Sequence, residues 1–564
     1  MAQEVLICIS FIVAIAAVST IIARIIKQPP LIAYLISGVL AGPLFFNIIG
    51  GDASNLIQLF AHIGVALLLF IIGLSLDLKL LKEVGFVSVI AGIFGMVITT
   101  GAGYLIATAL GFNTVSSVYL GIILAFSSTV VVVKILSDKK EIDTLHGRIA
   151  LGILIVQDFA AAIVLMVVPL FAHQSNFSNM LTKFTIAIIA IISIFIFSNY
   201  VLNKFLNYLA RSQETLFLFG ISWALIFASL FYKLGFSLEI GALIAGMSLA
   251  SSKYTIELGG KIKPLRDFFV MLFFVFFGSQ LTNLGDFQMI KALIILSLFI
   301  LIGKPIISMI TLRLFGYKKR TNFLASSSLA QISEFSLILA LLAFNLGQVS
   351  EGFMNLIILI ALITIGVSSY GIYYSHAIFN SISRWLNLFE GNKKEENKQI
   401  KKENYDVILF GYHRIGYKIL QTLKELKISF LVVDYNPKVV LSLADKGINC
   451  VYGDASDKEF LSEINMGKAK IVISTIPDEY SNLMIRERLN ETKSQAVLIA
   501  TSEQPRVALD LYKQGADYVI IPQHLGGDYA ANMIKQFHTD KSKYILEGKK
   551  HLKSLRYSKD SSNF

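Results

Sequence analysis

The chain has 564 residues, of which 55% are hydrophobic and only 16% are charged, and its mean hydropathy is +0.67. This composition excludes a soluble globular protein of that length and predicts a chain that lies largely in lipid. The formal net charge of +12 arises in large part in short loops between apolar runs and in a basic tail. That distribution indicates membrane topology rather than a nucleic-acid partner.

Apolar runs long enough to cross a hydrocarbon core recur along the first two-thirds of the chain and predict about thirteen membrane-spanning helices. Lys and Arg concentrate in the loops after odd-numbered runs and are nearly absent after even-numbered ones. By the positive-inside rule, the N-terminus is expected outside and the C-terminal part in the cytoplasm. The runs fall at residues 4–24, 30–50, 56–76, 84–110, 114–137, 148–172, 180–202, 214–232, 235–252, 267–284, 289–315, 322–346 and 353–379.

Ionisable residues occur inside two of these runs. The sixth run carries Gln157 and Asp158, and the eleventh carries Lys304 between Gly303 and Pro305. A charge deep in a span is costly unless it is paired or faces water, so each is a candidate functional group. The alternatives are a buried Asp158 that only locks packing and a Lys304 that snorkels to an interface.

Hydroxyl clusters interrupt two further runs. Ser127, Ser128 and Thr129 lie in the fifth, and Ser333 with Glu334 lies in the twelfth. Unwound carbonyls and hydroxyls make oxygen ligands for a desolvated monovalent cation, although small residues also serve ordinary helix packing. The two breaks are about seven spans apart. When a structural unit repeats after an odd number of spans, its second copy has the opposite orientation in the membrane. The sequence therefore predicts inverted repeats with crossed broken helices, which is typical of a carrier.

The chain changes character after the last run. Residues 1–384 are predicted to form the transmembrane domain, 385–404 a charged linker, 405–540 an α/β domain and 541–564 a basic, disordered tail. Short β-rich runs alternate with helical stretches, which predicts a doubly wound, Rossmann-like parallel sheet. The predicted strands are residues 407–410, 430–433, 450–452, 471–475, 496–501 and 518–521.

A glycine-rich loop after the first of these strands predicts a nucleotide site, with an acid ending the second strand to grip a ribose. His413 stands where the middle glycine normally lets the backbone approach a pyrophosphate. That departure favours a mononucleotide such as AMP over NAD(H), and the alternative is a sheet that binds nothing and only dimerises. The candidate residues are Gly411, His413, Arg414, Gly416, Asp434, Gly453 and Asp454.

These residues resemble the monovalent cation:proton antiporter-2 family, particularly the glutathione-gated bacterial potassium efflux antiporters. The resemblance runs along nearly the whole chain. The Gly453-Asp454 pair also resembles the nucleotide-binding regulatory domains attached to potassium transporters. The carriers of the family resemblance are Gln28-Pro29-Pro30, Gly38, Gly42-Pro43, residues 67–74 with Asp77, Ser127-Ser128-Thr129, Gln157-Asp158, Gly241-Ala242, Ala245-Gly246 and Ser333-Glu334-Phe335.

The resemblance implies a homodimer in the cell membrane in which a core bundle moves against a dimerisation bundle. It implies that the carboxylate of Asp158 binds a monovalent cation and a proton alternately. Two-acid members of the family are regarded as sodium-selective, so Gln157 beside Asp158 favours one-for-one exchange of potassium, with sodium as the alternative. Lys304 matches the family's membrane lysine, but Gln157 removes the acid that would pair with it, so its partner stays open.

Other classes of function fit less well. A nucleotide-gated potassium channel needs a filter such as Thr-Val-Gly-Tyr-Gly, and this chain has none. No substrate domain or catalytic His/Lys arrangement accompanies the sheet, so we do not predict an enzyme. A membrane sensor without transport is the remaining alternative, and transport by vesicles would exclude it. The predicted partners are potassium or sodium ions, protons, a regulatory nucleotide, membrane lipid and a second copy of the chain.

Overall fold

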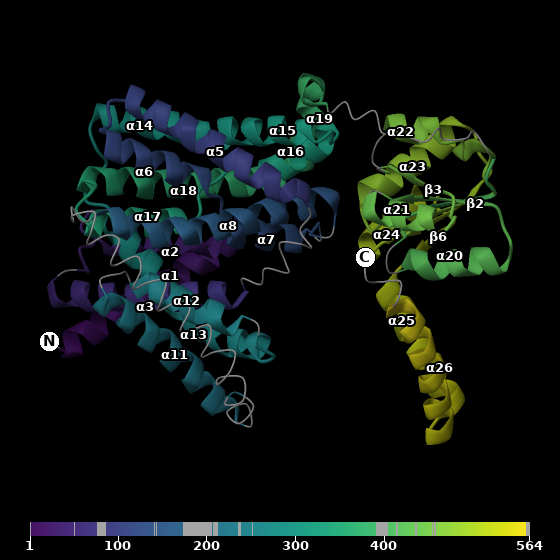
Figure 1. Cartoon of the computed structure of the whole chain (residues 1–564), viewed down its shortest axis with the longest axis horizontal. Helices are drawn as coiled ribbons and strands as arrows, with labels where there is room; N and C mark the ends of the chain where they lie inside the picture. Colours follow the sequence, from purple (N-terminus) through teal and green to yellow (C-terminus); the bar gives the residue numbers. More distant parts are fainter. Residues whose placement is uncertain are drawn as a thin grey trace. The chain divides into compact units, whose positions relative to one another are not determined.

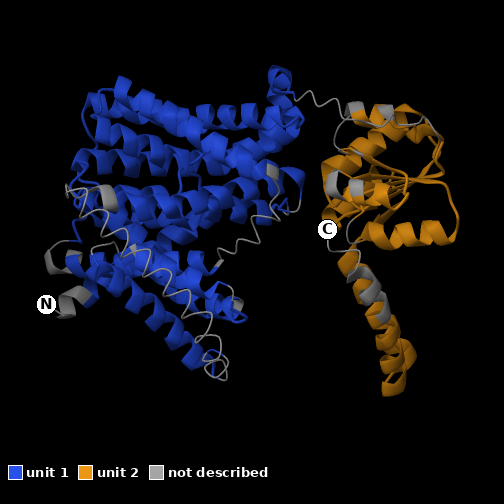
Figure 2. Ribbon diagram, viewed as in Figure 1, with its two compact units in different colours: residues 1–392 blue, residues 393–564 orange. Residues whose placement is uncertain are grey.

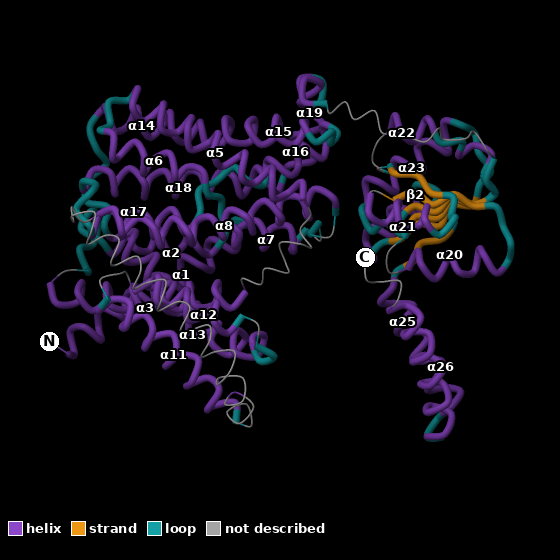
Figure 3. Tube along the Cα trace, in the orientation of Figure 1, coloured by secondary structure: helices purple, strands orange, loops and turns teal. Residues whose placement is uncertain are grey.

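The computed structural model describes residues 2–49, 51–75, 86–139, 141–142, 144–172, 206, 212–234, 238–250, 252–390, 404–412, 415–434, 437–453, 455 and 458–559. The chain forms two compact units, Met1–Asn392 and Lys393–Phe564 (Figure 2). The first is helical and the second contains a parallel sheet (Figure 3). This is the two-part architecture that the sequence predicts.

The helices of the first unit pack in two groups (Figure 1). The first bundle contains α1 (Ala2–Ile25), α2 (Pro30–Ala41), α3 (Gly51–Ser75), α11 (Gln213–Lys233), α12 (Leu238–Leu249) and α13 (Thr255–Ser279). The second bundle contains α5 (Phe86–Ala109), α6 (Thr114–Ala125), α7 (Thr129–Asp138), α8 (Leu145–Ala172), α14 (Phe287–Leu298), the π-helix η2 (Phe299–Gly303), α15 (Lys304–Leu314), α16 (Lys319–Ser327), α17 (Glu334–Asn345) and α18 (Glu351–Tyr373). After α18 come α19 (Ser375–Ile382) and the 3-10 helix η3 (Trp385–Phe389).

The predicted count of thirteen spans is not confirmed. Every predicted run except the seventh overlaps a helical segment, although bounds differ, and the seventh, 180–202, lies outside the described residues. Among the described residues, eight helical segments are long and apolar enough to cross a membrane. The apolar helices α2, α12 and α17 have only 12 residues each. At 1.5 Å per residue such a helix covers about 18 Å, which is too short to cross a hydrocarbon core alone.

Glycines bring helix backbones of the first bundle into contact. A Cβ added at Gly246 of α12 would lie 2.1 Å from the carbonyl oxygen of Phe70 in α3, and one added at Gly73 would lie 2.4 Å from that of Leu243. Where the surrounding solvent is lipid, helices associate through such close packing rather than through the hydrophobic effect. The glycines at these crossings are therefore required by the distance between the helices.

The second unit contains one six-stranded parallel sheet in the order β3-β2-β1-β4-β5-β6. The strands are β1 (Val407–Phe410), β2 (Phe430–Asp434), β3 (Cys450–Tyr452), β4 (Ile471–Ser474), β5 (Val497–Thr501) and β6 (Tyr518–Ile520), each within one residue of its prediction. The connecting helices are α20 (Ile415–Glu425), α21 (Pro437–Asp445), α22 (Lys458–Glu463), α23 (Glu479–Glu491) and α24 (Pro505–Lys513). The strand order changes direction between β1 and β4, which places a crevice at their carboxyl ends.

The C-terminal tail differs from its prediction. Residues expected to be disordered form α26 (Lys541–Lys559), which follows α25 (Pro522–Phe537). The Asp540 side chain accepts a hydrogen bond from the Ser542 backbone N–H at 3.1 Å, which caps the start of α26. The Tyr529 hydroxyl donates to Glu547 at 2.7 Å and joins the two helices. These local contacts explain why a highly charged segment is helical.

The start of the predicted linker contains the 3-10 helix η3. Residues 385–390 are structured because two side chains of the second bundle hold their backbone. Asn322 donates from Nδ2 to the Phe389 carbonyl at 3.0 Å, and Arg313 donates from Nε to the Glu390 carbonyl at 3.2 Å. The remainder of the predicted linker, apart from Asn404, lies outside the described residues.

We predict that Gly246→Ala lowers the thermal unfolding midpoint of the purified protein, because the methyl group would clash with backbone rather than with a movable side chain. Overpacking of this kind costs about 1–3 kcal/mol. Gly371→Ala is the matched control, since a Cβ at that helical position meets nothing within 4 Å. Equal midpoints for the two variants would contradict the packing argument.

Candidate functional site

The two helix breaks predicted from the hydroxyl clusters lie against each other. The first separates α6 from α7 at residues 126–128, and the second separates α16 from α17 at residues 328–333. The Ser127 hydroxyl donates to the Leu329 carbonyl at 3.1 Å, and the Ser336 hydroxyl donates to the Ile123 carbonyl at 2.7 Å. Backbone groups at membrane depth must find partners inside the protein. Each break therefore satisfies part of the other, as crossed broken helices require.

Serines at the breaks also begin the helices that follow. Ser128 accepts a hydrogen bond from the Val131 N–H at 3.3 Å and caps α7. Ser333 accepts one from the Phe335 N–H at 3.2 Å and caps α17, with the reciprocal bond supplied by Ser336. Both helix N-termini thus start inside the protein. The first N–H groups of each helix have no acceptor within the helix, and together with the helix dipole they favour a negative charge at this point.

Two carboxylates lie beside these N-termini, and a hydroxyl group bonds each one. Thr129 donates to Oδ2 of Asp158 at 2.7 Å, and Ser128 donates to Oε2 of Glu334 at 2.9 Å. Ser333 is 3.4 Å from the same Glu334 oxygen. Glu334 is buried, whereas Asp158 keeps part of its surface accessible. Asp158 is therefore the carboxylate better placed to meet an ion or a proton.

Gln157 contacts the first break through its amide oxygen. Its Oε1 accepts a hydrogen bond from the Ser127 backbone N–H at 3.1 Å, and the side chain is buried. A residue in an unwound segment has lost its intrahelical partner, and the amide replaces it. This contact gives Gln157 a structural role at the site, immediately before Asp158 in α8.

Lys304 joins the two breaks. Its Nζ donates to the Phe126 carbonyl at 2.7 Å and to the Gln331 carbonyl at 3.0 Å, so one acceptor comes from each break. Its side chain is buried, which excludes a lysine that snorkels to an interface. The partner that the sequence left open is therefore backbone oxygen.

The backbone around Lys304 is irregular. The π-helix η2 precedes it, and the Lys304 N–H bonds to the carbonyl of Phe299, five residues earlier. Pro305 follows at the start of α15 and supplies no N–H of its own. The π turn that ends at Gly303 therefore lies directly before Lys304 and Pro305. Single π-helical turns of this kind are frequent at functional sites.

In the second unit, the glycine loop after β1 is tightly built. Gly411 has φ +85°, and a Cβ there would lie 2.5 Å from the Thr475 hydroxyl. A Cβ at Gly416 would lie 2.0 Å from the carbonyl oxygen of Gly411. The Thr475 hydroxyl is also within 3.0 Å of that oxygen. Both glycines are therefore required by the turn itself.

The acid at the end of β2 lies beside the glycine loop. Oδ2 of Asp434 accepts a hydrogen bond from the Tyr412 N–H at 2.9 Å, and the side chain is buried. Gly453, after β3, lies under the ring of Phe460, which a Cβ would meet at 1.9 Å. The candidates His413, Arg414 and Asp454 lie outside the described residues.

Sequence reasoning missed two contributors. Ser336 completes the cap of α17 and bonds the Ile123 carbonyl in the last turn of α6, and its spacing from Ser333 is the capping-box spacing that could have revealed it. Thr475 follows β4, which pairs directly with β1, so it lies at the point where the strand order reverses. That position could be found once the sheet order was known.

Residues 12–372 match the family described as sodium/hydrogen exchanger, transmembrane. The chain belongs to this family. Residues 407–522 of the exchanger match the TrkA-N domain. It is thus a cation/proton antiporter with an attached TrkA-N domain, and the antiporter family expected from the sequence is confirmed.

Two curated relatives extend along most of the exchanger. The putative cation/proton antiporter YbaL of Escherichia coli strain K12 is 26% identical over 556 residues, which is 95% of this chain and 97% of the relative. The glutathione-regulated potassium-efflux system protein KefC of Escherichia coli O6:K15:H31 is 28% identical over 502 residues, which is 86% of this chain and 78% of KefC.

Two solved structures are similar to parts of the exchanger. The sodium proton antiporter MjNhaP1 of Methanocaldococcus jannaschii covers 68% of the exchanger and 99% of its own chain, with TM-score 0.46 and 17% identity. The TrkA-N domain of the inner membrane protein ybaL from Escherichia coli covers 24% of the exchanger and 96% of its own chain, with TM-score 0.22 and 23% identity.

We predict that Lys304→Met destabilises the exchanger, because two buried carbonyls would lose their hydrogen-bond donor. Each buried carbonyl left without a partner lowers the free energy of unfolding by about 1–3 kcal/mol. Lys134→Met is the matched control, since the Lys134 side chain is 61% exposed and pairs with Asp138 on the surface of α7. Thermal unfolding of both variants in the same detergent measures the effect. An unchanged midpoint for Lys304→Met would show that the two breaks hold together without it.

Proposed function

We propose that the exchanger moves potassium ions against protons, one for one, with Asp158 as the group that carries both. The observation that supports this most directly is the position of Asp158, a partly accessible carboxylate at the junction of two broken helices, 2.7 Å from the Thr129 hydroxyl. A cation that enters without its hydration shell needs oxygen ligands and a counter-charge. Carboxylate, hydroxyl and carbonyl oxygens are all available at this junction.

Exchange follows from competition for one carboxylate. A protonated Asp158 has no charge to offer a cation, and a cation at Asp158 disfavours protonation, so the two ions occupy the site alternately. Alternating access then requires that the second bundle present the site to each side in turn. Lys304 keeps the break carbonyls together during that cycle, and buried Glu334 stays bonded to Ser128.

Potassium is favoured over sodium by two observations. An amide, Gln157, precedes Asp158, whereas the two-acid members of the resembled family, regarded as sodium-selective, carry a second acid there. KefC, a relative over 86% of this chain, is a potassium-efflux system by name. The same site with sodium as its cation remains the alternative, and transport assays with both ions distinguish them.

We predict that Asp158→Asn abolishes exchange while the protein stays folded, because an amide can neither take up a proton at working pH nor neutralise a desolvated cation. Asp138→Asn, the same substitution at a 58% exposed side chain of α7, is expected to leave exchange unchanged. Vesicles with an imposed proton gradient and potassium, sodium or lithium in parallel provide the assay. Exchange retained by Asp158→Asn would remove Asp158 as the carrier.

The proposal includes a topology and an assembly. The basic loops after odd-numbered apolar runs support an N-terminus outside the cell membrane and a cytoplasmic TrkA-N domain. The resemblance of the sequence to dimeric antiporters supports a homodimer. The two bundles of the first unit then serve as a dimerisation bundle and a core bundle, with Asp158 and Lys304 in the second.

An adenine nucleotide is proposed as the regulator of the TrkA-N domain. The strand order, the glycine turn at Gly411 and Gly416, and Asp434 at the end of the adjacent strand support a nucleotide at the carboxyl ends of β1 and β2. AMP and NAD(H) are the candidate ligands. A nucleotide regulates exchange only through a difference in its affinity for the resting and active states.

We predict that an adenine nucleotide binds the purified protein and that Asp434→Asn weakens its binding. The amide keeps an acceptor for the Tyr412 N–H but removes the charge that grips a ribose. Asp445→Asn, at an exposed position on α21, is the matched control. Calorimetric titrations with AMP, ATP, NAD and NADH give the affinities, and vesicle assays with any binder give its effect on exchange.

Two outcomes would count against nucleotide regulation. If no nucleotide binds below the millimolar range, the domain is a dimerisation module rather than a sensor. If a nucleotide binds but the rate of exchange is unchanged, regulation fails while the assignment of the fold stands.

A further inference from the structure

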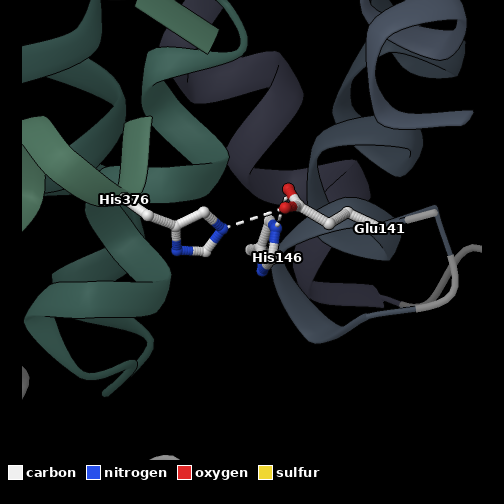
Figure 4. Close-up of side chains that lie close together, drawn as sticks. All are labelled: Glu141, His146 and His376. Atoms are coloured by element: carbon white, nitrogen blue, oxygen red, sulfur yellow. Dashed lines mark hydrogen bonds and ion pairs between the residues drawn. The ribbon is translucent and has the colours of Figure 1, made fainter. Parts of the chain in front are cut away.

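A second cluster of ionisable side chains lies outside the ion site, where α8 begins. Glu141 lies between α7 and α8, His146 is in the first turn of α8, and His376 is on α19. Nε2 of His376 is 2.9 Å from Oε1 of Glu141, and Nε2 of His146 is 3.3 Å from Oε2. Figure 4 shows the two rings converging on the carboxylate from different helices.

Glu141 is partly buried beside two imidazoles and an ammonium group. Its side chain is only 13% exposed, and this burial opposes ionisation. The hydrogen bonds from His146 and His376 and the charge of Lys139 outweigh the burial and hold the pKa of Glu141 well below its usual range. Independently of its charge state, the Glu141 carboxylate lies within 3.3 Å of one imidazole nitrogen from each of two histidines.

We propose that Glu141, His146 and His376 form a binding site for a divalent transition-metal ion of the zinc class. Two imidazoles and one carboxylate are a ligand set that zinc takes in proteins, with ligand distances of about 2.0–2.2 Å. Tetrahedral coordination at those distances places ligand atoms roughly 3.4 Å apart. The separations of 3.3 and 2.9 Å end on different oxygens of Glu141, and one ligand atom from each of the three residues lies within 4.8 Å of the other two.

Neighbouring side chains are arranged around the ligands. The Thr144 hydroxyl lies 3.1 Å from Nδ1 and 3.3 Å from Nε2 of His146, so it contacts the ring without selecting one of its nitrogens. Lys139 lies 3.0 Å from Oε2 of Glu141 and competes with a metal for that oxygen. Its Nζ is also within 3.2 Å of the Ile372 carbonyl and 3.3 Å of the Ser375 hydroxyl. Lys139 therefore has other acceptors when a metal displaces it.

Arg320 sets a further condition on metal binding. Its NH2 group is 3.3 Å from Nδ1 of His376, and a guanidinium only donates. In the metal-free protein Nδ1 thus accepts, and Nε2–H of His376 donates to Glu141. A metal at Nε2 replaces this proton, so binding releases or relocates a proton and is weaker than at a site already prepared for metal.

A metal ion bound by these three residues would link three segments of the chain. Glu141 follows α7, which carries Thr129 at its other end, and His146 opens α8, which carries Asp158. His376 belongs to α19, the helix that precedes η3 and the end of the first unit. The metal would therefore join the end of α7 and the start of α8 to the segment that follows α18. The site uses none of the residues proposed to carry ions.

The experiment measures zinc binding to the full-length exchanger after removal of any affinity tag. Competition with a chromophoric chelator gives stoichiometry and affinity, and Co²⁺ absorption reports tetrahedral nitrogen and oxygen ligation. We expect one ion per chain, and affinity reduced at least about tenfold in Glu141→Gln, His146→Asn and His376→Asn. His524→Asn, at an exposed position in the second unit, is expected to bind as the unaltered protein does.

Lys139→Gln separates a metal site from an ordinary hydrogen-bonded cluster. It removes the cation that competes for Glu141, so it should tighten zinc binding, whereas a purely structural cluster would only lose stability. Thermal unfolding without metal checks that each variant is folded. The proposal is overturned if the unaltered protein binds zinc with a Kd no lower than about 100 μM, or if none of the three ligand substitutions weakens binding.

Discussion

The membrane unit depends on the two hydrogen bonds of one ammonium group. Lys304 donates to the carbonyls of Phe126 and Gln331, which belong to helix breaks that lie far apart in sequence. In lipid, broken helices leave backbone groups that water cannot reach, and each such group is costly to bury without a partner. A cation that satisfies one carbonyl from each break makes the crossing stable. The same crossing places the helix N-termini of α7 and α17 beside Asp158 and Glu334.

Hydroxyl groups perform two tasks at this crossing. Ser128 caps α7 through one lone pair and donates its proton to Glu334, while Ser127 bonds the opposite break through its side chain and Gln157 through its backbone. Small polar residues are thus needed both for the fold and for the polarity of the site. A mutational effect at any of these serines mixes the two contributions, whereas Asp158 has one described partner, Thr129.

The sequence predicts the architecture well where patterns are local. The positions of the strands could be predicted because each is a short β-rich run between helical stretches. Asp158 and Lys304 could be predicted as site residues because charged residues are rare in apolar helices. The partners of Lys304 could not be predicted, since backbone carbonyls have no side-chain signature. The Glu141 and His376 contact joins residues 235 positions apart, and both occur where polar residues are ordinary. Helix α26 was missed because contacts such as that of Tyr529 with Glu547 are not visible in composition.

The contact of Gln157 with the Ser127 N–H has a consequence for the electrical character of transport. The amide acts there as an acceptor through Oε1. A glutamate has nearly the same shape and offers the same acceptor, so this hydrogen bond by itself does not require an amide. The charge of that glutamate would change the net charge that crosses the bilayer in each cycle. Each additional charge is driven by the membrane potential with about 2.3 kcal/mol per 100 mV, so a single atom exchanged at position 157 could make the cycle sensitive to voltage.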